Sequence, residues 1–160
     1  MKTKIGDIVL YHDSNAWFSR MIRKFTKSNY NHVGIYAGDN FIAEALNNGF
    51  VYTNKFNPDE YEGVNVYRLK TQPRFNKDKL RSIINKYIGI KYSWFDIFKI
   101  ALYTITKLKI FRRRTKRMIC SEAVAQIYDD YGFDLFPKIK NYDYITPEDI
   151  ASSNKLIRIK

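Results

Sequence analysis

The sequence predicts an α+β protein in which helices pack on a small antiparallel sheet. Segments with strand-like composition gather in the first half of the chain, and segments with helical spacing gather in the second half. Residues that favour tight turns separate neighbouring strands. The chain has 160 residues, of which 45% are hydrophobic, so it can form one domain over residues 1–160 with a continuous core.

The first expected strand is the apolar segment Asp7–Tyr11. Ser14, a capping residue type, follows this strand, and large apolar residues then recur at helical spacing. This spacing predicts a helix from Ser14 to about Lys27, which the polar segment SNYN ends.

A hairpin is expected over HVGIYAGDNFIAEAL, residues 32–46, because β-rich arms flank the turn-forming sequence Ala-Gly-Asp-Asn. The next expected strands are Gly49–Thr53 and Val64–Leu69, since both are rich in β-branched and aromatic residues. The polar loop NKFNPDEYEG separates these two strands.

Helices dominate the prediction for the second half of the chain. Asn76 caps a helix that runs to about Tyr87, and Gly89 ends it. A second helix, apolar on most sides, is expected over residues 94–108.

A third helix is expected over Cys120–Tyr131, where Gly132 is a natural C-terminal stop. Thr146–Ala151 predicts a short turn of helix, and Lys155–Ile159 predicts a last strand.

The charge of the chain indicates anionic partners. It carries 28 Lys and Arg residues against 16 Asp and Glu residues, a net charge of +12. Much of this charge lies in KLKIFRRRTKR, residues 107–117, which we expect to form either a solvated loop or a lip beside Cys120 that contacts an anionic membrane or cell-wall polymer. Nucleic acid is not an expected partner, because no helix-turn-helix, zinc-finger or aromatic RNA-binding signature adjoins the run. The basic residues of the run are Lys107, Lys109, Arg112, Arg113, Arg114, Lys116 and Arg117.

The sequence contains no expected membrane-crossing or secretory segment. No apolar run precedes Asp7, and no uncharged apolar stretch of about 18 residues occurs. A cytoplasmic location is the default expectation, with association with a membrane surface as the alternative. The single cysteine, Cys120, excludes an internal disulfide and a cysteine-cluster metal site, and no metal or organic cofactor is expected.

Cys120 is a candidate nucleophile because of its place at the start of a helix. The two residues before it are not capping types, so N–H groups of the first turn can lack side-chain acceptors. Those groups and the helix dipole would stabilise a thiolate, and they could also hold an oxyanion formed on an attacked carbonyl. The alternatives are a buried core cysteine, and a helix that starts one residue later with Ser121 as its cap.

The helix that carries Cys120 has one apolar stripe. Cys120, Val124, Ile127 and Tyr131 fall on it, so the thiol is expected to face inward.

A cysteine nucleophile requires a base, which is usually histidine. The chain has two histidines, His12 and His32. His32 opens an expected strand, where its alternative role is a hydrogen bond to the backbone. His12 follows the first strand in the turn-like sequence HDSN, as a hydrated turn residue, a substrate-binding residue or an alternative base.

Glu44 is the candidate orienting acid, because the expected hairpin can bring it to His32. A loop over Ala37–Asp39 would place the two residues directly opposite each other, and a loop over Gly38–Asn40 would make them diagonal neighbours. Their Cβ atoms would be about 5 Å or about 7–8 Å apart, respectively, within reach of a Glu–His contact. A two-residue Gly38-Asp39 loop would put them on opposite faces. The alternative for Glu44 is a solvated charge on an edge strand.

Five segments occur in an order that resembles a known enzyme family. GDIVLY, NHVGIYAG, IAEAL, GIKYSWFD and ICSEAV, spread from Gly6 to Tyr131, are similar to the YiiX-like permuted papain-like amidases of the NlpC-type cysteine hydrolase superfamily. The resemblance implies a circularly permuted papain-like fold, in which a small sheet or half-open barrel carries a histidine and an acid and the cysteine helix packs against it. This chain departs from the pattern in its long, basic insertion before ICSEAV and in Ala123, where a larger aliphatic residue is common.

The resemblance assigns the nucleophile to Cys120, the base to His32 and the orienting acid to Glu44. It also suggests that Tyr11 and Tyr92 line the substrate pocket, for which ordinary aromatic core is the alternative. The function it implies is cysteine-dependent hydrolysis of a peptide or amino-acid amide, often from the cell wall, through an acyl-enzyme. A lipid-directed acyltransferase or thioesterase at anionic membranes is one alternative, and a non-enzymatic basic binding module is another.

Overall fold

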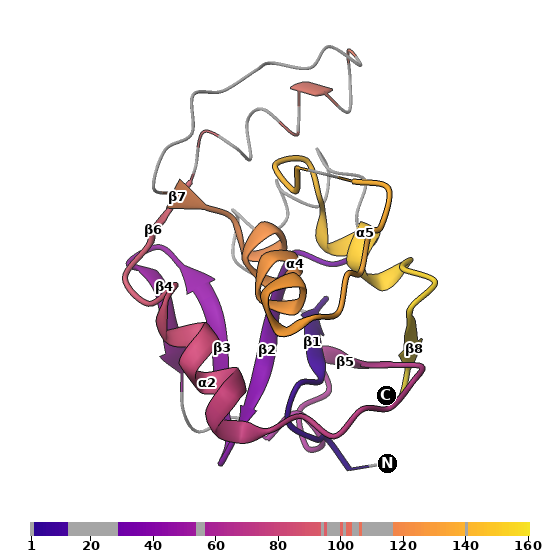
Figure 1. The fold of residues 1–160 in the computed structure, drawn as a ribbon. Helices are drawn as coiled ribbons and strands as arrows, with labels where there is room; N and C mark the ends of the chain where they lie inside the picture. The colour runs from indigo at the N-terminus through magenta and orange to yellow at the C-terminus, as the bar shows by residue number, and fades with distance from the viewer. Residues whose placement is uncertain are drawn as a thin grey trace.

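The protein is α+β, with helices packed on one six-stranded antiparallel sheet (Figure 1), as the sequence predicts. The computed structural model describes residues 2–12, 29–53, 57–93, 95, 100, 102–103, 106, 117–139 and 141–160. The strands of the sheet are β1 (Ile8–Tyr11), β2 (His32–Gly38), β3 (Phe41–Leu46), β4 (Gly49–Thr53), β5 (Val64–Leu69) and β8 (Leu156–Arg158). The helices are α2 (Lys77–Asn85), α4 (Cys120–Tyr131) and α5 (Pro147–Ala151), and two short strands, β6 (Lys91–Tyr92) and β7 (Arg117–Met118), pair with each other.

The strand order of the sheet is β4-β3-β2-β1-β5-β8. Strand β1 lies inside the sheet, because it pairs with β2 on one side and with β5 on the other. Strand β1 therefore connects strands β2, β3 and β4 on one side to β5 and β8 on the other.

Most predicted elements occur at the predicted places. Helix α2 is capped by Asn76, whose side chain accepts a hydrogen bond from the N–H of Lys79 at 2.8 Å. Helix α4 has the predicted bounds, and Gly132 ends it at a φ of 107°, which is favourable for glycine. The helix expected between Ser14 and Lys27 lies outside the described residues, as does most of the helix expected over 94–108.

The β2–β3 hairpin has a two-residue turn with an additional residue beside it. Asp39 and Asn40 form the turn, and both have positive φ, as in the type I′ turns that favour Asn and Asp. Tyr36 pairs with Ile42, whereas Gly38 pairs with Phe41, so Ala37 is a bulge. The resulting register places Gly34 opposite Glu44, which is the register predicted for the diagonal arrangement.

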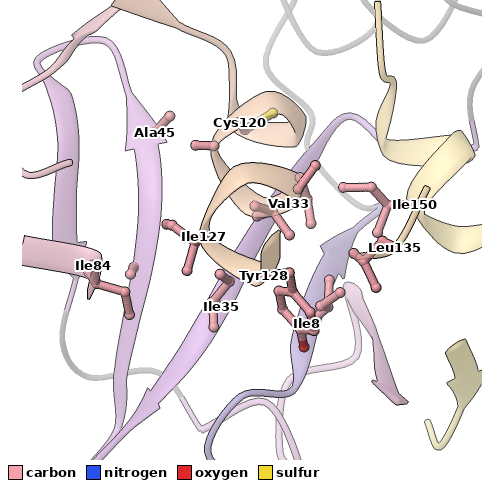
Figure 2. Packing of buried hydrophobic residues seen from close by; sticks show 14 of the residues in the cluster. Ile8, Val33, Ile35, Ala45, Ile84, Cys120, Ile127, Tyr128, Leu135 and Ile150 are labelled. Carbon is pink, nitrogen blue, oxygen red and sulfur yellow. The ribbon is translucent and has the colours of Figure 1, made fainter. Parts of the chain in front are cut away.

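The two faces of the sheet carry different side chains. Val33 and Ile35 of β2 belong to the main core cluster together with residues of α4 such as Ile127 (Figure 2). Strand alternation sends His32, Gly34 and Tyr36 to the opposite face. There Tyr36 packs against a smaller cluster that contains Val9, Ile42 and Val64.

Helix α4 runs in the same direction as β2. Near the C-terminal end of α4, the Tyr128 hydroxyl donates a hydrogen bond to the carbonyl of Gly6. The N–H of Gly6 in turn donates to the carbonyl of Tyr36 at 2.9 Å, so this part of α4 lies near the end of β2. The N-terminus of α4, with Cys120, therefore lies near the start of β2, where His32 is the first residue.

A buried ion pair connects the segment before β1 to β5. The guanidinium of Arg68 donates to both carboxylate oxygens of Asp7, at 2.7 and 2.6 Å, and both side chains are almost fully buried. The Asp7 carboxylate also accepts the N–H of Lys4 at 2.6 Å. The negative charge of Asp7 is thus compensated by protein groups, so the carboxylate does not need water as a partner.

We expect Arg68→Met to lower the free energy of unfolding by about 3–5 kcal/mol, because the Asp7 carboxylate would stay buried without its cation. Urea denaturation followed by circular dichroism measures this change. The double variant Asp7→Leu/Arg68→Met should recover much of the loss, and Arg74→Met, which changes an exposed side chain, is the matched control. Equal stability of the Arg68→Met variant and the wild type would contradict the prediction.

Candidate active site

Cys120 is the first residue of α4, and the N-cap residue of this helix makes no side-chain hydrogen bond to it. The N-cap residue is Ile119, whose backbone is extended and whose side chain accepts no hydrogen bond. Ser121, the alternative cap, instead donates its hydroxyl proton to the carbonyl of Ile145 at 2.5 Å. The Glu122 carboxylate accepts the N–H of Ile119 at 3.4 Å. The cap position therefore supplies no side-chain acceptor to the N–H groups at the start of α4.

The Cys120 thiol faces inward, as its stripe predicts, and only 5% of the residue is exposed. His32 and Tyr92 both lie close enough to Cys120 for its sulfur to raise their pKa values. Helix α4 packs against the face of Val33, whereas the His32 side chain belongs to the other face of β2. The two side chains meet because His32 is the first residue of its strand, at the point where α4 begins (Figure 2 shows Cys120 at this end of the helix).

His32 and Glu44 form the second contact of the site. His32 Nε2 lies 2.8 Å from Glu44 Oε2, and their side chains are 19% and 8% exposed. Gly34 lies directly opposite Glu44, between His32 and Tyr36 on the same face. A Cβ atom at Gly34 would be 3.2 Å from the Glu44 Cβ and 2.6 Å from Ile42 Cγ2. The absence of a side chain at Gly34 gives the Glu44 carboxylate room to reach diagonally to His32.

The Glu44 carboxylate is held by two hydroxyl groups in addition to His32. Thr53 of β4 donates to Glu44 Oε1 at 2.5 Å, and Tyr11 of β1 also donates a hydrogen bond to the carboxylate. The Tyr11 ring lies 5.2 Å from the His32 ring, measured between centroids. Residues from four neighbouring strands, β1 to β4, thus fix one carboxylate against one imidazole.

The surroundings of His32 favour its charged form. Burial lowers its pKa, but hydrogen bonds to Cys120 and Glu44 and the negative charges of these groups outweigh burial and raise the pKa to about 10, from an ordinary value of 6.5. Burial also raises the pKa of Glu44, but its hydrogen bonds and charge interaction with His32, together with Thr53 and Tyr11, bring that pKa below its ordinary value. The geometry therefore stabilises an imidazolium that donates from both ring nitrogens, one to the sulfur and one to the carboxylate.

Tyr92 reaches Cys120 through the small parallel sheet of β6 and β7. Tyr92 pairs with Met118, two residues before Cys120, and the N–H of Ser93 donates to the Met118 carbonyl at 3.1 Å. Burial, followed by the charge and hydrogen bond of Cys120, raises the pKa of the Tyr92 hydroxyl well above its usual value. Tyr92 is thus a protonated donor to the sulfur.

The structure brings all the predicted site residues together except His12. Cys120, His32 and Glu44 come together, and the predicted pocket residues Tyr11 and Tyr92 lie at the two ends of this chain of contacts. His12 follows Tyr11, but its ring lies 6.5 Å from the ring of Tyr30, measured between centroids. The structure therefore places His12 against Tyr30 beside the end of β1.

Sequence reasoning missed the roles of Thr53 and Gly34. The turn between β3 and β4 is Asn47-Asn48, a pair of residues that favours two-residue hairpin turns. The register that follows from this turn places Val51 opposite Glu44 and Thr53 on the same face, as a diagonal neighbour. The Asn47-Asn48 turn, which places Thr53 beside Glu44, could have been recognised in the sequence. The importance of Gly34 could not, because it depends on the bulge at Ala37.

The basic run lies mainly outside the described residues. Of its seven basic positions only Arg117 is described, as an exposed residue of β7. The predicted contacts of this run with membranes or wall polymers stay predictions. None of the described helices is long and apolar enough to cross a lipid bilayer.

A scan against models of protein families and a search of curated proteins both give no match to this chain.

We expect Gly34→Ala to destabilise the protein by about 1–3 kcal/mol, because the added methyl group would overlap Ile42 and push Glu44 away from His32. Chemical denaturation measures the loss. Gly89→Ala is the control, since its Cβ would have no heavy atom within 4 Å, although its φ of 82° adds backbone strain of about 1–2 kcal/mol. Only Gly34→Ala should also alter the titration of His32. An unchanged titration in that variant would show that Gly34 does not govern the His32–Glu44 contact.

We expect His32 to titrate at a pKa of about 10 in the folded protein. Loss of an anionic partner removes a contribution that raises this pKa, so Glu44→Gln and Cys120→Ala should each lower it. Nuclear magnetic resonance of the ring nitrogens, in a His12→Asn background that leaves one histidine, measures the value. A midpoint near 6.5 that neither substitution changes would contradict the ion-pair arrangement.

Proposed function

We propose that this protein is a cysteine-dependent amide hydrolase in which Cys120 is the nucleophile, His32 the acid–base group and Glu44 the residue that orients His32. One observation carries the proposal: a buried thiol at the start of a helix lies close enough to an imidazole to raise its pKa, and a buried carboxylate holds Nε2 of that imidazole at 2.8 Å. A core cysteine requires none of these polar contacts. A nucleophilic cysteine depends on a basic partner, and a carboxylate that orients this base assists it.

The first half of the reaction forms an acyl-enzyme. His32 holds the proton of Cys120, and the thiolate sulfur attacks the amide carbonyl carbon, whose C=O π electrons move to the oxygen. The tetrahedral intermediate collapses as its C–N bond breaks, and the His32 imidazolium gives its proton to the leaving amine. The pKa of His32, raised to about 10, keeps this proton on the ring at neutral pH until the amine leaves.

The second half releases the acid. Once His32 is neutral, it removes a proton from a water molecule, which attacks the thioester carbonyl. The C–S bond then breaks, the carboxylic acid leaves, and the sulfur regains its contacts with His32 and Tyr92. Throughout both halves, Glu44 keeps the ring oriented by holding Nε2, so Nδ1 is the nitrogen that serves the sulfur.

The order of the three residues along the chain supports a permuted papain-like fold as the finer assignment. His32 and Glu44 lie on early strands, and the helix that carries Cys120 follows them and packs on the same sheet. This is the arrangement implied by the resemblance to the YiiX-like amidases. On that resemblance we propose small peptide or amino-acid amides, including cell-wall peptides, as substrates.

We expect the wild-type protein to be acylated on Cys120 by an activated acyl donor such as p-nitrophenyl acetate. Intact-mass spectrometry detects the acetyl group, and absorbance detects the p-nitrophenolate. Cys120→Ala should abolish the acetylation, and His32→Gln should slow it by about 10²–10⁴-fold, the usual contribution of a general acid–base group.

His12→Gln is the matched control, because it removes the other histidine and should leave the rate near that of the wild type. Release of acid from a panel of amino-acid amides and wall peptides then defines the natural leaving group. A wild-type protein whose Cys120 is not acylated by any of these donors would refute the proposed function.

A further inference from the structure

Asn31 is a buried polar residue without a visible structural task. Only 5% of the residue is exposed. Within the part of the chain that the structure describes, neither its side-chain nitrogen nor its side-chain oxygen has a hydrogen-bond partner. Most buried polar side chains in folded proteins are paired, and an unpaired one requires an explanation such as a catalytic role.

The backbone of Asn31 is fixed at the candidate active site. Asn31 directly precedes His32, and its N–H donates to the carbonyl of Tyr11 at 3.0 Å. Tyr11 itself donates to Glu44 and packs on the His32 ring. The position of Asn31 is therefore set by the same groups that position His32 and Glu44.

Asn31 lies in a bend directly before β2, at the end of the strand where His32 is the first residue. Val33, the other neighbour of His32, belongs to the same cluster as Cys120 and Val124. Because α4 runs in the same direction as β2 and begins beside His32, Asn31 lies at the junction between the start of β2 and the N-terminus of α4.

We propose, on the basis of the proposed hydrolase function, that the Asn31 carboxamide donates a hydrogen bond to the oxyanion that forms when the Cys120 thiolate attacks an acyl carbonyl. In that step the C–S bond forms and the π electrons of the C=O bond move to the oxygen. The negative charge then lies between the uncapped N–H groups of α4 and the amide N–H₂ of Asn31. A donor that has no partner in the resting protein needs to break no bond to serve the oxyanion.

Two reactions of the same sulfur separate this role from others. Alkylation by iodoacetamide displaces iodide from a saturated carbon and creates no oxyanion, whereas acylation by p-nitrophenyl acetate does create one. For Asn31→Leu, which keeps the approximate volume without the amide, we expect acylation to fall by about 10²–10³-fold, the usual effect of losing one oxyanion donor. The alkylation rate should stay within about twofold of the wild type, since the Cys120–His32 pair is intact.

Stability provides an independent readout. Because the Asn31 amide is unpaired, its replacement by leucine should leave the melting temperature unchanged or raise it. Asn65→Leu is the matched control: its buried side chain donates to Tyr30 at 2.8 Å and accepts from Arg158 at 2.7 Å. That variant should melt at a lower temperature and keep the wild-type acylation rate while folded. Asn31→Gln, which retains an amide, should recover part of the acylation rate and serves as a second variant if leucine prevents folding.

The outcomes distinguish this inference from the proposed function. If Asn31→Leu is acylated as fast as the wild type, the oxyanion role is overturned and the hydrolase proposal stands. Parallel losses of acylation and alkylation in Asn31→Leu would overturn it too, because Asn31 would then act by positioning the Cys120–His32 pair. A wild-type protein that is alkylated but never acylated would overturn both proposals.

Discussion

The pairing register between β2 and β3 is the constraint on which the candidate site depends. With the two-residue Asp39-Asn40 turn and no bulge, Glu44 would lie opposite Ile35 and its side chain would leave the face of His32. The extra residue, Ala37, shifts the strand by one position and returns Glu44 to that face, opposite Gly34. One bulge residue thus decides whether the carboxylate meets the imidazole or enters the apolar core beneath α4. Gly34 then completes the arrangement by leaving the space that the carboxylate crosses.

The second requirement is that His32, a residue of one face of the sheet, contacts Cys120 of the helix that packs on the opposite face. Helix α4 packs on the face of Val33, and His32 belongs to the other face, so a contact between the sulfur and the imidazole is impossible along most of β2. It becomes possible at the first residue of the strand, where the sheet ends and the helix begins. Helix α4 runs in the same direction as β2 and is fixed at its far end by the Tyr128–Gly6 hydrogen bond, so its first residue, Cys120, lies at the first residue of the strand.

The sequence is sufficient to predict most of the described helices and strands. It is insufficient to predict how His32 of β2 comes to contact Cys120 of α4. The strands Gly49–Thr53 and Val64–Leu69 and the helix Cys120–Tyr131 are predicted with their observed bounds, because composition and stop residues act locally. The sequence leaves three loops open for the hairpin, since the bulge at Ala37 has no local signature. Strands β6 and β7 have two residues each and therefore no periodicity to detect, so the link between Tyr92 and Cys120 follows only from the structure. The roles assigned to Cys120, His32 and Glu44 stay predictions, to which the structure adds their proximity.

The charges of the site and of the whole chain are related. With the thiolate proposed for Cys120, the site would hold two negative charges and one positive charge in a largely buried place, which is costly without compensation. Hydroxyl groups of Tyr11, Thr53 and Tyr92 supply part of the compensation by donating to the two anions. The whole chain has a net charge of +12, and a positive net charge favours anionic over neutral groups. In the proposed reaction, this positive charge would favour the oxyanion of the acyl intermediate over the neutral carbonyl from which it forms. An excess of basic residues, often associated with nucleic-acid binding, is thus also compatible with the chemistry proposed for Cys120.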